Sequence, residues 1–149
     1  MRYFLDTEFN GFGGALLSLA LVPEDGEEFY ITLACDEPAH PWVAQNVLPY
    51  LDHVPVGLDS PRLGRESAAV AIAAYLAHDP APEIVADWPD DIAYFNQLLL
   101  VGPGQMVAVH DLTFRLVNLP GFSTAENSAV SHNALHDARA LREHLLGME

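Results

Sequence analysis

Four acidic residues and one histidine lie in a fixed order along the chain and could together bind metal ions. They are Asp6 and Glu8, then Asp91, then His132 and Asp137. Four carboxylates held close together repel one another and cannot all ionise without cations. Carboxylate oxygens suit Mg²⁺ or Mn²⁺ better than zinc, and a histidine can take up a proton near neutral pH. These residue types predict a two-metal site with a histidine base.

The first two acids lie at the end of a predicted strand near residues 2–8. This segment is rich in aromatic and branched side chains, which favours a strand. Side chains alternate along a strand, so Phe4, Asp6 and Glu8 share one face. Ligands of open α/β sheets bind at the carboxyl ends of strands. We therefore expect a site here, although a frayed strand end with solvated acids would show the same pattern.

The middle acid lies where a short buried strand passes into a helix that begins with a proline. Three residues compete for the role: Asp87, Asp90 and Asp91. An aromatic pair three and four residues after Asp91 favours this residue, because the pair would anchor the helix on the sheet. Capping of the helix by the acid is the simpler alternative. Asp87, at the strand end, is then a candidate for contact with substrate.

His132 and Asp137 flank the expected start of the last helix, which Ser131 or Asn133 could cap. Positions five apart in a helix diverge by about 140°, so this pair would not share a face within one helix. The two side chains converge if His132 lies on the loop or in the first turn and Asp137 faces the sheet. A surface position is the simpler interpretation of His132, and His136 is the rival histidine.

The rest of the chain supplies elements that could position these residues. We expect strands near 2–8, 15–23, 28–34, 83–87 and 106–110, and helices near 41–48, 62–78 and 90–101 and at the C-terminal end. The length fits one domain, residues 1–149, large enough to bury a core. No repeat or linker interrupts it.

Composition limits the possible partners and compartments. The net charge is −15, with six arginines and no lysine, so we expect weak binding to long duplexes, because such binding relies on basic side chains. No segment is long and apolar enough to span a membrane, and no secretory signal opens the chain. Cys35 has no partner for a disulfide. These features favour a cytoplasmic protein.

The three motifs together resemble the DEDDh 3′–5′ exonucleases of the ribonuclease H-like superfamily. The closest resemblance is to the small RNase AS-like exoribonucleases, with ribonuclease T and oligoribonuclease as wider relatives. The likeness covers Arg2 to Phe9, Trp42-Val43 followed by Val47 to Leu51, Asp91 to Leu98, and Ala134 to Leu141. The chain departs from the pattern at Asp87, where many relatives have an asparagine.

The resemblance implies an α/β fold with a five-stranded mixed sheet, in the order 3-2-1-4-5, flanked by helices. It implies a site in which Asp6, Glu8, Asp91 and Asp137 hold two Mg²⁺ or Mn²⁺ ions about 4 Å apart, with His132 as the base. The expected reaction releases nucleoside 5′-monophosphates from the 3′ ends of single-stranded RNA or short oligonucleotides, with a preference for adenylate. A DNA exonuclease of the proofreading type and a non-catalytic binding module of the same fold are the alternatives.

Substrate contacts are expected from residues around the acids: Thr7, Glu8, Phe9, Phe12 and Asp87. With so few cations, the chain would hold bases by aromatic stacking, through Phe12 or through Phe9, which could instead be a core residue.

A homodimer is also expected, as in the wider relatives. The alanine-rich helix near 62–78 has few charges and could bury more than one face. Arginines such as Arg62, Arg65 or Arg115 could then line the partner's acidic cleft.

Overall fold

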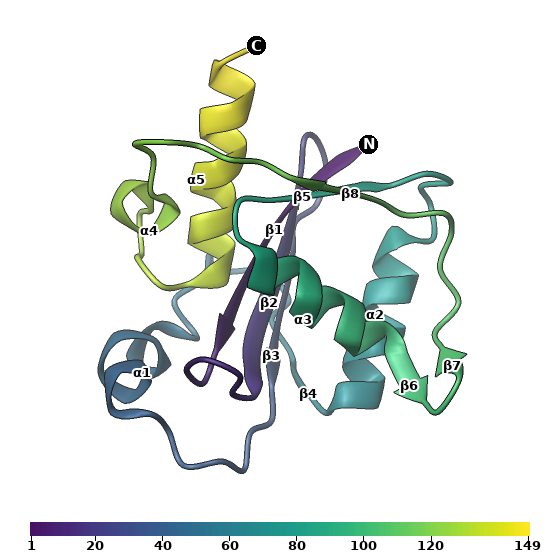
Figure 1. Cartoon of the computed structure of the whole chain (residues 1–149), viewed down its shortest axis with the longest axis horizontal. Coiled ribbons are helices and arrows are strands. Elements are labelled where there is room, and N and C mark those ends of the chain that lie inside the picture. The colour runs from purple at the N-terminus through teal and green to yellow at the C-terminus, as the bar shows by residue number, and fades with distance from the viewer.

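The apolar segments at the start of the chain form the centre of a mixed sheet, in a computed structural model that describes residues 1–149 (Figure 1). Six strands make up this sheet in the order β4-β3-β2-β1-β5-β8. They are β1 (Arg2–Phe9), β2 (Leu16–Pro23), β3 (Phe29–Leu33), β4 (Arg62–Leu63), β5 (Glu83–Ala86) and β8 (Thr113–Leu116). Strands β6 (Leu100–Gly102) and β7 (Gln105–Met106) form a separate hairpin.

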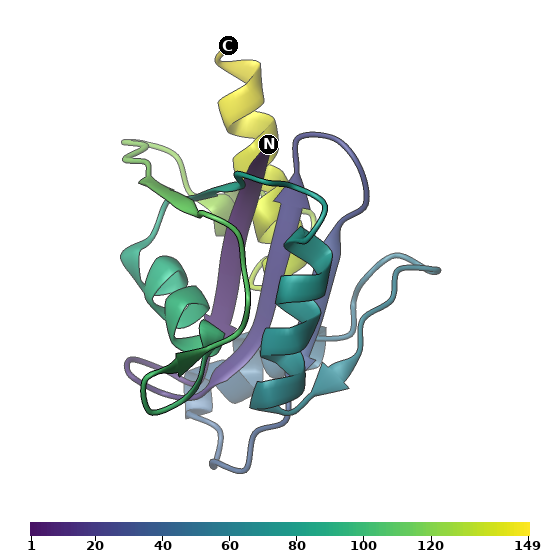
Figure 2. The ribbon, with the colours of Figure 1, turned by 90° about the vertical axis from the view of Figure 1, so that its right-hand side faces the viewer.

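Helices cover both faces of this sheet, as the two views show (Figures 1 and 2). Helices α2 and α3 pack on one face, and α5 packs on the other. The helices are α1 (Pro41–Asn46), the 3₁₀ turn η1 (Leu48–Tyr50), α2 (Arg65–Leu76), α3 (Pro89–Leu99), α4 (Thr124–Asn127) and α5 (Ala134–Gly147). None of them is long and apolar enough to cross a membrane.

Alternation along β1 divides its side chains between two core layers. Leu5 lies in the cluster that contains residues of α2 and α3, and Phe4 lies in the cluster that contains residues of α5. The same alternation puts Asp6 and Glu8 on the α5 side of the strand and Thr7 on the α3 side. The end of β1 can therefore contact groups from both helical layers.

Strand β1 extends beyond its parallel neighbour β5. The two strands pair only from Arg2 to Phe4 of β1, whereas β2 pairs with β1 as far as Phe9. After Ala86 the chain leaves the sheet and enters α3 at Pro89. The carboxyl end of β1 is thus open on one side, which is the position where α/β sheets bind ligands.

The prediction of a strand at 106–110 is wrong. Val107 and Val109 alternate as strand residues would, and they pack against the core, but beyond β7 this segment joins no ladder. The edge strand is instead β8, in a segment expected to be a loop. It pairs in parallel with β5 and is mostly exposed, so its sequence shows no apolar alternation.

The sheet has six strands where five were expected, because Arg62–Leu63 pairs with β3 as the short strand β4. The helix expected from residue 62 consequently begins at Arg65. With β8 as the fifth long strand, β3-β2-β1-β5-β8 follows the expected order 3-2-1-4-5.

Candidate active site

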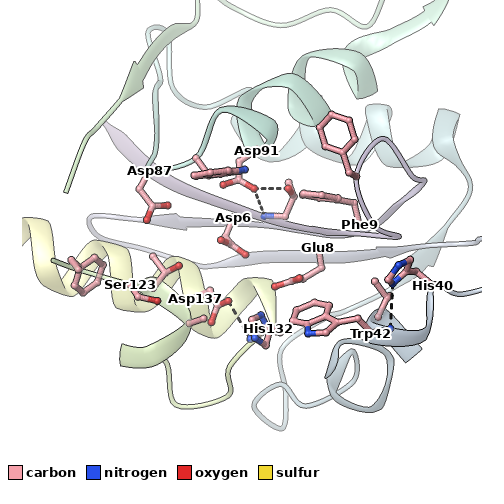
Figure 3. Close-up of a pocket in the computed structure, with 18 residues that line it drawn as sticks. Asp6, Glu8, Phe9, His40, Trp42, Asp87, Asp91, Ser123, His132 and Asp137 are labelled. Atoms are coloured by element: carbon pink, nitrogen blue, oxygen red, sulfur yellow. Dashed lines mark hydrogen bonds between the residues drawn. The ribbon is translucent and has the colours of Figure 1, made fainter. Parts of the chain in front are cut away.

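A cleft of about 670 Å³ lies at the open end of β1, bounded by the starts of α1, α3 and α5 (Figure 3). Five acidic residues line it: Asp6, Glu8, Asp87, Asp91 and Asp137. His132 lines it as well. The fold therefore brings the four predicted metal-binding acids, the predicted base and Asp87 into one cavity.

Asp6 and Glu8 reach the cleft floor from β1. Asp6 is buried, and its Oδ2 atom has no hydrogen-bond partner. A buried carboxylate oxygen without a donor is costly in free energy. A proton, a cation or a hydrogen-bond donor that enters the cleft would complete this group.

Asp91 enters the cleft from the first turn of α3. Trp88 is extended (φ −130°, ψ 135°) before the proline that starts the helix, as expected for a residue before proline. One oxygen of Asp91 accepts hydrogen bonds from the backbone N–H of Thr7 (3.1 Å) and from the Thr7 hydroxyl. Asp90 instead accepts from the indole N–H of Trp88 and lies outside the cleft. Among the three competing acids, the contacts single out Asp91 as the one tied to β1.

Asp137 and His132 come together because the histidine lies outside the helix. Asn133 caps α5, and its side-chain oxygen accepts from two backbone N–H groups of the first turn. His132 precedes the cap in a left-handed conformation (φ 62°), and its backbone N–H donates to Asp137 Oδ2 at 3.2 Å. Asp137 Oδ1 is buried without a partner. This is the arrangement expected if the two residues converge.

His136 is directed elsewhere. A ring nitrogen of His136, Nε2, lies 2.8 Å from the carbonyl oxygen of His53, and the residue does not line the cleft. The His132 ring instead lies edge-on to the indole of Trp42, with centroids 4.9 Å apart. The geometry therefore favours His132 over its rival.

Burial raises the pKa values of the clustered carboxyl groups, and repulsion between them adds to the effect. The pKa of Asp6 is raised well above its usual range by burial and then by the charges of Asp91 and Glu8. Burial chiefly raises the pKa of Glu8 to about 9, that of Asp91 to about 7 and that of Asp137 to about 6. Burial also lowers the pKa of His132, so its ring favours the neutral form.

The side chains present fit a divalent cation. Glu8, His132 and Asp137 offer ligand atoms that all lie within 4.8 Å of one another. Asp6 and Asp137 each have one buried oxygen without a hydrogen-bond partner in the chain, and carboxylate oxygens are the ligands that Mg²⁺ and Mn²⁺ prefer. The cluster could therefore hold a metal ion, with His132 either as a ligand or, as the sequence predicted, as a base.

Aromatic side chains form the rim of the cleft. Phe12, on the turn between β1 and β2, is 99 % exposed, and Trp42 and Trp88 are each about half exposed. Phe9 is half-buried and stacks on Tyr94 with ring centroids 4.7 Å apart. Phe12 is thus a free stacking surface, whereas Phe9 is mainly part of the wall.

Several cleft residues were not identified from the sequence: His40, Trp42, Trp88, Ser123 and Thr124. They lie on loops and helix starts, where no periodic pattern shows which side chain faces a cavity. The available signal was weak: each tryptophan adjoins a proline that begins a helix.

No arginine lines the cleft. Five of the six arginines make contacts elsewhere in the chain: Arg2 with Glu24 and Glu149, Arg62 with Asp52, Arg65 with the carbonyl oxygen of Gln97, and Arg139 and Arg142 with Glu28. Glu24 and Glu28 on the turn between β2 and β3 are therefore ion-paired. The charge of the cleft has no compensation from arginine side chains.

No model of a known protein family matches the chain, and no curated protein matches it.

The raised pKa values predict that the metal-free protein loses stability as pH rises. Above about pH 4 the unfolded state releases the carboxyl protons that the folded state retains, so the free energy of unfolding falls until the raised pKa values are passed. Between about pH 7 and about pH 9, Glu8 dominates this loss, and His132, with its lowered pKa, contributes little. Thermal unfolding in EDTA should show a falling midpoint across this range.

Two controls sharpen this measurement. Asp6→Asn removes one buried charge without changing volume, so its midpoint should fall less steeply with pH. Added Mg²⁺ should raise the midpoint of the unmodified protein most at the alkaline end. A profile that is the same for both proteins, or no response to Mg²⁺, would contradict the assignment of these carboxylates as an incomplete cation site.

Proposed function

We propose that the chain is a metal-dependent 3′–5′ exoribonuclease that hydrolyses phosphodiester bonds at RNA 3′ ends and releases nucleoside 5′-monophosphates. The observation that carries this proposal is the convergence of four acidic residues, three of them buried and two with unpartnered oxygens, beside a histidine. The order of the five long strands and the likeness of the motifs to DEDDh exonucleases support a ribonuclease H-like fold.

Four acids from three elements would hold the ions: Asp6 and Glu8 from β1, Asp91 from α3 and Asp137 from α5. Divalent ions held there, two in the proposed mechanism, would neutralise charge on the phosphodiester and lower the pKa of a bound water. Thr7 fixes one oxygen of Asp91, which leaves the other oxygen free to bind.

His132 would accept the proton of the attacking water. Its ring is partly buried, and burial lowers its pKa, so a lone pair is available at neutral pH. The backbone bond to Asp137 and the edge contact with Trp42 hold the ring at the cleft. The same position would let it bind a metal ion, so the two roles need separate tests.

The substrate would be single-stranded. The cleft offers acids on its floor and aromatic faces on its rim, and stacking holds unpaired bases without using charge. Asp87 lines the cleft at the end away from His40 and Trp42 (Figure 3), where it could accept hydrogen bonds from sugar hydroxyl groups. The choice of RNA, and any preference for adenylate, is supported by the resemblance of the motifs alone.

A DNA exonuclease of the proofreading type would use the same carboxylates, and a non-catalytic binding module would share the fold without cleaving. The experiment that separates all three is hydrolysis of end-labelled RNA and DNA oligonucleotides of one sequence, with Mg²⁺ and with EDTA. The proposal predicts mononucleotides from the RNA 3′ end only when Mg²⁺ is present. Faster cleavage of DNA would support the proofreading alternative, and no cleavage of either would support the binding module.

Two substitutions test the metal ligands. Asp6→Asn and Asp137→Asn each remove one charge and keep the side-chain volume, so we expect hydrolysis to be lost while the melting temperature is kept or raised. Circular dichroism melts provide the folding control. Activity retained in either variant, or in an excess of EDTA, would rule out the proposed metal mechanism.

Two histidine variants test the base. His132→Ala should lower turnover by about 10²–10⁴-fold, whereas His136→Ala should have little effect, because the His136 ring lies against the His53 carbonyl outside the cleft. The stabilisation by Mg²⁺ should survive in His132→Ala if the residue is a base. Loss of that stabilisation would make it a ligand, and a larger effect of His136→Ala would show that the wrong histidine was assigned.

Phe12 is the proposed stacking residue. Phe12→Ala should weaken oligonucleotide binding by about 1–3 kcal/mol without lowering the melting temperature, because the ring is almost fully exposed. Phe9→Ala is the matched control and should lower the melting temperature, since Phe9 packs on Tyr94. Binding measured by fluorescence anisotropy in Ca²⁺ checks both. Unchanged binding by Phe12→Ala would remove it from the substrate site.

A homodimer remains a proposal that the exposed surface supports only in part. Helix α2 exposes Val70, and the β6–β7 hairpin, whose strand β6 contacts α2, exposes Leu100 and Met106. A second copy could cover these apolar side chains. Arg62 and Arg65 already have partners in their own chain, so arginine exchange would require them to change partners. Light scattering at micromolar concentration should give a dimer mass, and a monomer with full activity would exclude the dimer.

A further inference from the structure

We infer that His40 is a substrate-contacting residue whose Nε2–H donates to a backbone phosphate other than the one being cleaved. This inference rests on the proposed function, because it needs a nucleotide strand in the cleft. His40 lies on the loop before α1, lines the cleft and is exposed. His40 lines the same cleft as the acids, yet it has no assigned part in metal binding or proton transfer.

The contacts of the His40 ring fix its tautomer. The backbone N–H of Trp42 donates to Nδ1 of His40 at 3.2 Å. A nitrogen that accepts a hydrogen bond carries no proton, so the proton of the neutral ring is on Nε2. No protein group is hydrogen-bonded to Nε2. The ring therefore presents a free donor.

The position of the ring is held from the neighbouring turn. The backbone N–H of His40 donates to the side-chain oxygen of Asn10 at 2.8 Å, and the amide group of Asn10 donates to the carbonyl oxygen of Pro38 at 3.0 Å. Gly11 is a neighbour of the ring, since an added Cβ there would be in ordinary van der Waals contact with it, at 3.6 Å. The turn that carries Phe12 and the loop that carries His40 thus form one wall.

The electrostatics of the cleft call for such a donor. A nucleotide strand brings one negative charge per residue, and the cleft already has five acids and no arginine. Two imidazoles are the only side chains in the lining that can carry positive charge: His40 and His132. His132 is at the proposed reaction centre, which leaves His40 to contact the rest of the strand.

The location of His40 indicates which phosphate it would contact. Figure 3 shows His40 beyond Glu8 and Trp42, at the end of the cleft away from Asp87. The scissile phosphate would lie at the clustered carboxylates. A group at the far end would therefore meet a phosphate of a neighbouring nucleotide.

Capping of α1 is the simpler role for His40. This role uses the hydrogen bond to Nδ1 and gives no role to Nε2. Two substitutions separate the two nitrogens. Asn places its amide near the position of Nδ1 and is a strong N-cap, but it cannot reach the position of Nε2. Gln places an amide N–H near the position of Nε2 but is a poor cap. His40→Asn thus keeps the cap and loses the donor, and His40→Gln does the reverse.

The test compares steady-state hydrolysis of two substrates in Mg²⁺: a dinucleoside monophosphate, whose single phosphate is the scissile one, and a single-stranded RNA hexamer. For the hexamer, His40→Asn should raise KM by about tenfold at unchanged kcat, the loss expected for one hydrogen bond to a charged group. It should leave the dinucleotide KM and the melting temperature unchanged. His40→Gln should restore the hexamer KM to within about threefold and lower the melting temperature.

Any result that differs from these expectations overturns the inference. An unchanged hexamer KM in His40→Asn would remove the contact, and an equal rise for both substrates would place His40 at the cleaved nucleotide instead. A rise that persists in His40→Gln would show that an N–H near the position of Nε2 does not carry the effect, which removes the proposed donor. Wild-type protein that cleaves neither substrate would overturn the proposed function together with this inference, whereas normal wild-type cleavage with an unaffected variant overturns this inference alone.

Discussion

The structure depends on holding several carboxylates together, largely buried, in a cleft that no arginine side chain lines. Asp6, Asp91 and Asp137 are each less than a tenth exposed, and Glu8 lies beside them. Their charges repel, so ionisation is opposed both by burial and by the neighbours. Such a group persists in a folded chain only where the surrounding contacts fix it, and these contacts account for much of the local architecture. The functional proposal rests on the view that metal ions relieve this repulsion.

Two local features hold the group in place. The overhang of β1 past β5 exposes the strand end and frees the Thr7 N–H for Asp91. The Asn133 cap starts α5 after His132, so the histidine can turn back to Asp137. Each acid is thus positioned by rigid secondary structure and not by a mobile loop. No arginine lines the cleft, so a polyanion would be attracted through bound ions, stacking and hydrogen-bond donors.

The parts of the fold and site that could be predicted are those set by local pattern. Alternation in β1 placed Asp6 and Glu8 on one face, and the aromatic pair after Asp91 selected that acid among three. Residues five apart in a helix point in different directions, so His132 could meet Asp137 only if it lay before the start of the helix. The edge of the sheet could not be predicted from local pattern. Val107 and Val109 alternate as strand residues do, but they pack on the core without pairing. The exposed segment β8 is a strand because it pairs with β5. The cleft wall with His40 was also missed, since loop contacts leave no periodic trace.

The most direct test of the central claim is to locate the ions. Crystals grown with Mn²⁺ and measured near the manganese absorption edge would reveal bound ions by anomalous scattering. The account predicts two manganese peaks in the cleft, coordinated by oxygens of Asp6, Glu8, Asp91 and Asp137. An empty cleft at saturating Mn²⁺, or manganese only at acids outside the cleft such as Asp25, would contradict it.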